Sequence, residues 1–338
     1  MSSTRTTVDH QIKRGVSLYS FQDEAFRRSH SLEDLIHAAV SFGARGIEII
    51  PEQTFDNFPN VTDRQVAEWH ELLDRYGAQP TAYDMFLDTK RYTGRQLTLE
   101  ESAASLRRDI DLAQRLRTPV IRVIVSTEPA VVEAVASYAM DHDVKLALEV
   151  HAPVRYNSEW TLRHLDVIHK VDNGYVGLLP DMGTFTRKLP RVLVDRALRE
   201  GASPELVQYV VDQYNKLRWD RQAIPVEVAW KGGNPADLRL ANAATFYDCI
   251  DPRDMLPHMD YIFHIQAKFY EMVDDQHEYS IPYDEIIPVL IEGGYSGYLS
   301  SEYEGNRHIE DAFPVDSIEQ VRRQHAMFAR LLGESQNV

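Results

Sequence analysis

Short runs of apolar residues alternate along the chain with longer segments in which apolar residues recur every three or four positions. The runs predict buried strands, and the segments predict amphipathic helices that turn one face toward a core. Ser31-Leu-Glu-Asp34 has the spacing of a capping box at the start of one such helix. The predicted strands span residues 15–21, 46–50, 80–86, 119–125, 145–151, 176–181, 261–270 and 297–303.

Helices are predicted between these strands, and the regular alternation breaks once. After the sixth strand comes an insertion of about 186–258, with helical pieces at 190–200 and 204–216. Eight strands that alternate with helices predict an α/β fold, a closed (β/α)8 TIM barrel, with the whole chain, 1–338, as one domain. A doubly wound open sheet is the alternative, but no Gly-x-Gly-x-x-Gly follows the first strand. The other predicted helices span 31–42, 62–76, 99–116, 129–140, 159–171, 283–291 and 316–332.

Composition narrows the class of protein. Of the 338 residues, 43% are hydrophobic, enough for a sizeable core, and the formal net charge is −16. This acidity argues against a nucleic acid or an anionic membrane as the main partner, and no apolar run is long enough to span a membrane. Cys249 is the single cysteine, and residues 1–7 contain no apolar signal core. We therefore expect a cytoplasmic enzyme.

Ionisable side chains gather at the ends of the last four predicted strands. Alternation along the fifth strand places Glu149 and His151 on the same face, and Asp181 ends the sixth strand. The seventh and eighth strands carry His264 and Glu302. Because catalytic groups of barrel enzymes lie at the carboxyl ends of the strands, we expect these five side chains to converge at the barrel mouth.

Three carboxylates in one place repel one another unless a divalent cation balances them. Carboxylate and imidazole ligands without thiolate suit Mn²⁺, with Mg²⁺ and Co²⁺ as alternatives. A four-ligand site leaves one of the five side chains free. We assign Glu149, Asp181, His264 and Glu302 to the metal and His151 to the role of general base, because His151 lies further out along the strand, toward a substrate.

Each assignment has a purely structural alternative. Asp181 could be an ordinary turn aspartate, and His264 could be a core histidine with its hydrogen bonds satisfied. Glu304 faces the same way as Glu302 and competes with it for the metal, although Glu302 lies nearer the strand.

Three more polar residues are candidates for holding a substrate. Gln266 and Lys268 share the face of His264 and could bind hydroxyl or carbonyl groups, as could Glu304. Lys268 could equally form an ion pair with an acidic neighbour.

The order of these residues resembles a known family. Glu149, Asp181, His264 and Glu302 resemble the Glu, Asp, His and Glu ligands of the xylose isomerase-like TIM barrels, the sugar isomerase and epimerase superfamily. Stretches across nearly the whole chain resemble more closely the alpha subunit of bacterial C-glycoside deglycosidases. They are Arg14-Gly-Val-Ser-Leu-Tyr-Ser-Phe, Tyr83-Asp-Met-Phe-Leu-Asp-Thr-Lys90, Arg122-Val-Ile-Val-Ser126, Leu148-Glu-Val-His-Ala-Pro153, Pro180-Asp-Met-Gly183 and Ser301-Glu-Tyr-Glu-Gly305.

The resemblance implies a metal-dependent lyase that cleaves 3-oxo-C-glucosides of aromatic aglycones such as flavonoids. In that family a base removes a proton from C2 of the oxidised sugar, a metal ion stabilises the negative charge, and the bond from C1 to the aglycone then breaks. His151 matches the family's base. The resemblance also implies a partner, a small beta subunit that helps to close the active site.

Two other classes of function remain open. A ketose 3-epimerase or sugar isomerase is the first alternative, but epimerases usually have a substrate-binding His where this chain has Thr184. They also use two metal-bound glutamates as paired bases, whereas His151 offers a single separate base. The second alternative is a non-catalytic barrel that binds a sugar or a partner protein.

Overall fold

The computed structural model describes residues 11–87, 91–216, 220–247 and 249–334. The start of the chain, residues 88–90 of the stretch that begins at Tyr83, and the last residues of the predicted domain lie outside the described part. Among the described residues, none of the helices is long and apolar enough to cross a membrane.

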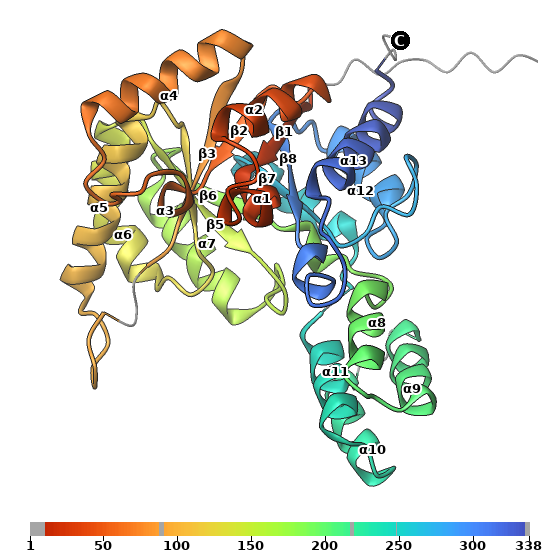
Figure 1. Ribbon diagram of the computed structural model, residues 1–338. Helices are drawn as coiled ribbons and strands as arrows, with labels where there is room; N and C mark the ends of the chain where they lie inside the picture. The colour runs from red at the N-terminus through yellow and green to blue at the C-terminus, as the bar shows by residue number, and fades with distance from the viewer. Residues whose placement is uncertain (1–10, 88–90, 217–219, 248, 335–338) are drawn as a thin grey trace, which may run out of the picture.

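Eight parallel strands form a nearly closed barrel, which confirms the predicted (β/α)8 fold (Figure 1). They are hydrogen-bonded in the order β6-β5-β4-β3-β2-β1-β8-β7, and parallel bridges from Leu178 to Ile262 and from Asp181 to Gln266 link the two edges. The strands are β1 (Lys13–Ser17), β2 (Gly46–Ile49), β3 (Gln79–Met85), β4 (Val120–Val123), β5 (Lys145–Val150), β6 (Val176–Pro180), β7 (Ile265–Phe269) and β8 (Tyr298–Tyr303).

Helices cover the outside of the barrel because their apolar faces pack against the outward-facing residues of the strands. The predicted capping box is present: Ser31 Oγ accepts a hydrogen bond from the Asp34 amide at 3.2 Å. The helices are α1 (Gln22–Phe26), α2 (Leu32–Ser41), α3 (Pro51–Thr54), α4 (Asp63–Tyr76), α5 (Leu99–Arg115), α6 (Pro129–Asp141), α7 (Glu159–Val171), α12 (Tyr283–Glu292) and α13 (Ser317–Leu331).

The first and seventh strands differ most from their predicted bounds. The first spans Lys13–Ser17, and the Ser17 hydroxyl caps a 3₁₀ turn, Leu18–Phe21. The seventh begins only at Ile265, after the 3₁₀ helix Pro252–Tyr261 and an isolated bridge at Ile262. Between the bridges from Leu178 to Ile262 and from Asp181 to Gln266, this part of the chain advances four residues and β6 advances three, which sets the side chains of β7 that lie level with the candidate site.

The insertion after β6 forms a helical bundle with its own apolar core, which extends from one side of the barrel (Figure 1). Its last two helices were not predicted. Residues 232–235 look like a polar break, but Asn234 caps the last helix. The returning chain is tied to the turn after β6: the Ile250 amide donates to the Thr184 carbonyl at 3.2 Å. The helices are α8 (Arg191–Arg199), α9 (Pro204–Asn215), α10 (Ile224–Trp230) and α11 (Pro235–Phe246).

The interior of the barrel is apolar at one end and polar at the other. Ala82, Val120, Ala147 and Leu179 form a small buried cluster against Phe263. Two residues further along the same strands, the inward positions are Asp84, Arg122, Glu149 and Asp181. The apolar layer therefore closes the amino-terminal end of the barrel beneath a polar layer that faces the mouth.

Candidate active site

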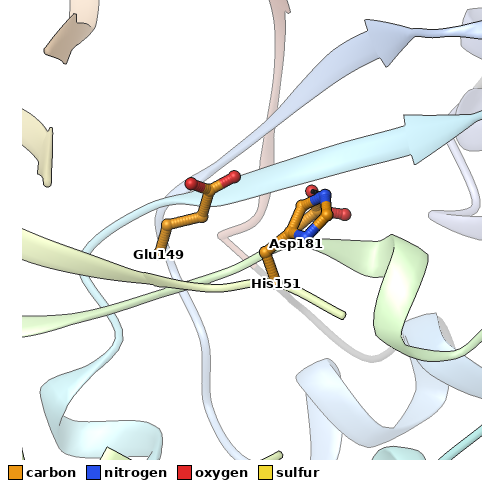
Figure 2. Close-up of side chains that lie close together, drawn as sticks. All are labelled: Glu149, His151 and Asp181. Carbon is orange, nitrogen blue, oxygen red and sulfur yellow. Dashed lines mark ion pairs between the residues drawn. The ribbon is translucent and has the colours of Figure 1, made fainter. Parts of the chain in front are cut away.

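Glu149, His151 and Asp181 come together at the mouth of the barrel (Figure 2). Glu149 lies on β5, His151 follows that strand, and Asp181 follows β6. Each residue offers a ligand atom, and the three atoms lie within 4.8 Å of one another. His151 Nε2 is 3.5 Å from Asp181 Oδ2. The structure thus brings together three of the five side chains that the sequence predicts for the site, in an arrangement that could hold a metal ion.

The turn after β6 fixes Asp181. Its Oδ1 accepts a hydrogen bond from the Gly183 amide at 2.6 Å, and the Thr184 hydroxyl donates to its main-chain carbonyl at 2.9 Å. A Cβ atom at Gly183 would lie only 2.9 Å from Oδ1, so glycine is needed for this close approach. Asp181 is therefore both a turn aspartate and a site residue, because Oδ1 caps the turn and Oδ2 faces the cluster.

The His151 ring has a defined tautomer. Its Nδ1 lies 2.5 Å from the carbonyl oxygen of Ala152. A carbonyl can only accept, so Nδ1 carries the hydrogen and the neutral ring leaves Nε2 unprotonated. The side chain is about one-fifth exposed, whereas Asp181 is fully buried. Nε2 is thus a basic nitrogen that points into the cluster from an accessible position, as a general base requires.

Lys268 forms ion pairs with the surrounding carboxylates. Its Nζ is 2.7 Å from Asp181 Oδ2, 2.9 Å from Glu304 Oε2 and 3.6 Å from Glu302 Oε2. Burial by itself would lower the pKa of Lys268, but these carboxylates raise it well above its usual range. The predicted pairing of Lys268 with an acidic neighbour is confirmed, and the ammonium group lies next to the cluster.

The two glutamates of β8 and its following turn differ in how fully they are bonded. Glu304 accepts from the Tyr19 hydroxyl at 3.1 Å and pairs with Arg307 and Lys268. Burial alone would raise the pKa of Glu304, but Lys268 and Arg307 lower it to about 2. Glu302 Oε2, in contrast, is buried and accepts no hydrogen bond from the described residues. Glu302 is thus the glutamate with an oxygen to spare for a further ligand.

His264, a predicted metal ligand, is not part of the Glu149, His151 and Asp181 group, and its ring contacts Glu48 instead. Its Nε2 is 2.6 Å from Glu48 Oε2, and both side chains are buried. Residues two apart on a strand differ by about 6.6 Å in height, so His264 lies below Gln266 and Lys268 on the same inward face. Gln266, and not His264, is bridged to Asp181, because the chain advances four residues from Ile262 to Gln266 while β6 advances three from Leu178 to Asp181.

Sequence reasoning missed Glu48, Asp84 and Arg122, which belong to the polar interior of the barrel next to the cluster. Arg122 Nη1 is 3.3 Å from Glu149 Oε2, and Arg122 Nε is 3.2 Å from Asp84 Oδ1. Gln266 Nε2 donates to Glu48 Oε1 at 2.8 Å and to Asp84 Oδ1 at 3.2 Å. The available signal was a charged residue in the middle of an apolar strand, as in Gly46-Ile-Glu-Ile49 and Val120-Ile-Arg-Val123.

The buried charges of the barrel interior do not balance. Gln266 Oε1, like Glu302 Oε2, is buried without a hydrogen-bond donor among the described residues. Burial raises the pKa of Glu302 well above its usual range, and neighbouring carboxylates raise it further against the effect of Lys268. A divalent cation would relieve both the repulsion and the missing donors, so the residues present fit such an ion. The buried acidic groups of the interior are Glu48, Asp84, Glu149, Asp181 and Glu302, and the buried basic groups are Arg122, Lys268 and His264.

Aromatic side chains border the site. The Phe246 ring, at the end of α11, lies 5.7 Å from the His151 ring between centroids, and the Phe86 ring lies 4.6 Å from the Arg122 guanidinium. These phenyl rings are 45% and 41% exposed. The barrel mouth therefore offers apolar contacts as well as charge.

Residues 36–330 match the protein family described as xylose isomerase-like TIM barrel. The chain belongs to this family. The match spans far more than half of the chain and includes β2–β8 with all the site residues discussed above.

Curated relatives confirm the closer resemblance found in the sequence. The chain is 32% identical over 310 residues to a C-glycoside deglycosidase alpha subunit of Microbacterium trichothecenolyticum, covering 86% of this chain and 83% of the relative. It is 30% identical to another protein of that name from Arthrobacter globiformis, covering 86% and 84%. A 3'-dehydrocarminate deglycosidase alpha subunit of Microbacterium sp. is 27% identical and covers 95% of both chains. These relatives are named as sugar-processing enzymes and as subunits of larger assemblies.

Solved structures agree with the fold. A D-tagatose 3-epimerase-like protein superposes with a TM-score of 0.54 at 16% identity, covering 95% of this chain and 98% of that one. The IOLI protein, solved with a bound zinc atom, gives a TM-score of 0.54 at 13% identity, covering 96% and 100%. At these identities the likeness concerns the barrel architecture alone.

Proposed function

We propose that this protein is a metal-dependent carbon–carbon lyase, the catalytic alpha subunit of a complex that releases the aromatic aglycone, such as a flavonoid, from a 3-oxo-C-glucoside. The observation that carries the proposal is the cluster of Glu149, His151 and Asp181 at the barrel mouth, in a chain whose relatives are named C-glycoside deglycosidase alpha subunits. The name of these relatives also supports a second, smaller beta subunit as partner.

The donor set that we propose for the cation differs in one member from the set expected from the sequence. Glu149, Asp181 and Glu302 are retained, and Gln266 takes the place of His264. Gln266 Oε1 and Glu302 Oε2 are buried oxygens without a donor among the described residues, whereas His264 is bonded to Glu48. Three carboxylate oxygens and one amide oxygen form a hard donor set, which favours Mn²⁺ or Mg²⁺, with Co²⁺ as an alternative.

The chain's own residues supply the proton transfer. The ketone at C3 makes the hydrogen on C2 acidic, and His151 Nε2 is placed to accept it, since Nδ1 donates to Ala152. When bound, a divalent cation would supply positive charge next to the oxygen that becomes negative. The electron pair left on C2 forms a double bond to C1 and expels the aglycone, which takes up the proton that His151 then holds. Lys268, which pairs with Asp181 and Glu304, would keep these carboxylates in position beside the sugar.

The rim of the site fits an aromatic leaving group. Phe246 and Phe86 are large, exposed and next to the catalytic layer. A planar aglycone that stacks on such rings would be held outside the polar pocket, while the sugar enters it. Thr184, which would be a substrate-binding His in most epimerases, here bonds to the Asp181 carbonyl.

The direct test is product analysis. The chain is co-purified with its small subunit, loaded with Mn²⁺ and incubated with a 3-oxo-C-glucoside of a flavonoid, and products are separated by chromatography. We expect free aglycone, and no aglycone from the same preparation after dialysis against a chelator. Epimerised sugar without aglycone would favour the ketose 3-epimerase, and an inert, metal-loaded protein would favour a non-catalytic sugar-binding barrel.

A further inference from the structure

A buried pair of side chains lies directly beneath the candidate site. His264 Nε2 is 2.6 Å from Glu48 Oε2, and the exposed fractions of the two side chains are 2% and 0%. Glu48 Oε1 accepts a hydrogen bond from Gln266 Nε2 at 2.8 Å. The two oxygens of one carboxylate thus connect His264 on one side with Gln266 on the other.

The carboxamide of Gln266 has one orientation that suits its neighbours. Its Nε2 carries two hydrogens, and these are directed to Glu48 Oε1 and to Asp84 Oδ1, at 2.8 and 3.2 Å. A flipped amide would place Oε1 against Glu48 Oε1, a carboxylate oxygen that can only accept hydrogen bonds, which is unfavourable in a buried site. Oε1 is therefore turned away from Glu48 and Asp84.

The remaining end of this amide is unsatisfied. Gln266 is fully buried, and its Oε1 accepts no hydrogen bond within the described part of the chain. Buried polar atoms are rarely left without a partner, so an orphan in an otherwise bonded network calls for a ligand. Gln266 is bridged to Asp181, whose Oδ2 belongs to the cluster with Glu149 and His151.

We propose that Glu48, held in place by His264, is a positioning residue that orients Gln266 so that Gln266 Oε1 can coordinate the divalent cation. This inference rests on the proposed function, because the cation is part of that proposal. It gives His264 a role one layer below the metal: His264 fixes Glu48, and Glu48 fixes the amide. Partners that orient metal ligands typically change metal affinity by ten- to a hundredfold when removed.

The test measures Mn²⁺ affinity on the full chain by electron paramagnetic resonance of the free ion, with the unfolding midpoint of the metal-free protein as a measure of fold. Glu48→Gln offers Gln266 a second amide and allows it to flip, so we expect the Mn²⁺ Kd to rise at least about tenfold. Asp109→Asn is the matched control, because Asp109 is a buried carboxyl outside the barrel interior that bonds to Tyr83. Its Kd should stay within about twofold of wild type.

A swap distinguishes positioning from loss of packing. In Glu48→Gln with Gln266→Glu, the amide at position 48 donates to a carboxylate at position 266, so an oxygen is again directed to the cation. We expect the double variant to regain most of the affinity, which a merely structural defect would not allow.

The outcomes separate the two proposals. If the wild-type chain binds Mn²⁺ and Glu48→Gln binds it with equal affinity, the positioning role is overturned and the proposed function stands. A wild-type chain that binds no Mn²⁺ overturns the proposed metal site and the positioning role with it. If Glu48→Gln does not fold, His264→Leu decides instead, because leucine offers Glu48 no hydrogen-bond donor, and a Kd within twofold of wild type overturns the proposal.

Discussion

Replacing His151 with alanine tests how the site divides its roles. The His151 ring is held by the Nδ1 hydrogen bond to Ala152 and is partly exposed, so its removal deletes a basic nitrogen without opening the core. A positioned general base contributes roughly 10²- to 10⁴-fold to the rate, which corresponds to about 2.7 to 5.5 kcal/mol of transition-state stabilisation. We expect kcat/KM for aglycone release to fall by that factor, with KM nearly unchanged.

The decisive second measurement is metal content. His151 Nε2 is 3.5 Å from Asp181 Oδ2, which also allows a different role, in which the imidazole is itself a metal ligand. Elemental analysis after dialysis should find the His151→Ala variant as fully loaded as wild type. His142→Ala is the matched control, since His142 lies at the end of α6 on the opposite face of the barrel and should affect neither measurement. A variant that loses its metal and keeps its turnover would refute the assignment of His151 as the base.

Three further predictions follow from the same structure. Phe246→Ala should raise KM for an aryl glucoside by about five- to tenfold, the equivalent of about 1 to 1.4 kcal/mol of lost ring contact. The KM for a 3-oxo-glucoside with a small aliphatic aglycone should not change. Equal effects on both substrates would contradict a role for this ring in aglycone binding. Removing the metal with a chelator should lower the free energy of unfolding by about 2.7 kcal/mol relative to protein in Mn²⁺ at a hundred times its Kd, and unchanged urea denaturation curves would argue against a resident cation. Burial raises the pKa of Asp109 to about 7, so the native protein holds a proton that the unfolded chain releases near pH 4. This contribution to stability is complete below about pH 4 and is lost as the pH rises to 7, at a slope of up to about 1.4 kcal/mol per pH unit. Asp109→Asn should remove that slope from the free energy of urea unfolding measured at pH 5, 6 and 7.

Much of the fold could be predicted because it depends on local patterns. The apolar runs and the helical periodicity specify eight strands and their covering helices, and the motif around Ser31 specifies a helix start that the structure reproduces. The site was predicted as far as it depends on the ends of single strands. Glu149, His151 and Asp181 meet because parallel strands present their carboxyl ends at one face of a barrel.

The register between neighbouring strands could not be predicted from the sequence. His264 and Gln266 are both on the inward face of one predicted strand, and alternation alone cannot say which of them is level with Asp181. That depends on an irregularity before β7, where four residues from Ile262 to Gln266 are matched by three residues of the neighbouring strand, from Leu178 to Asp181. The resulting register places His264 on Glu48 and leaves Gln266 beside the cluster.

By itself the sequence determined the barrel, the position of the insertion and the carboxylate and imidazole groups at the strand ends, since these follow from the periodicity of side chains along each element. Only the tertiary structure decided which of those groups face one another. Arg122 with Glu149, Lys268 with Asp181 and Phe246 with His151 are contacts between residues far apart in the chain. Such contacts depend on barrel closure and on the height of each strand relative to its neighbours, to within the length of one residue.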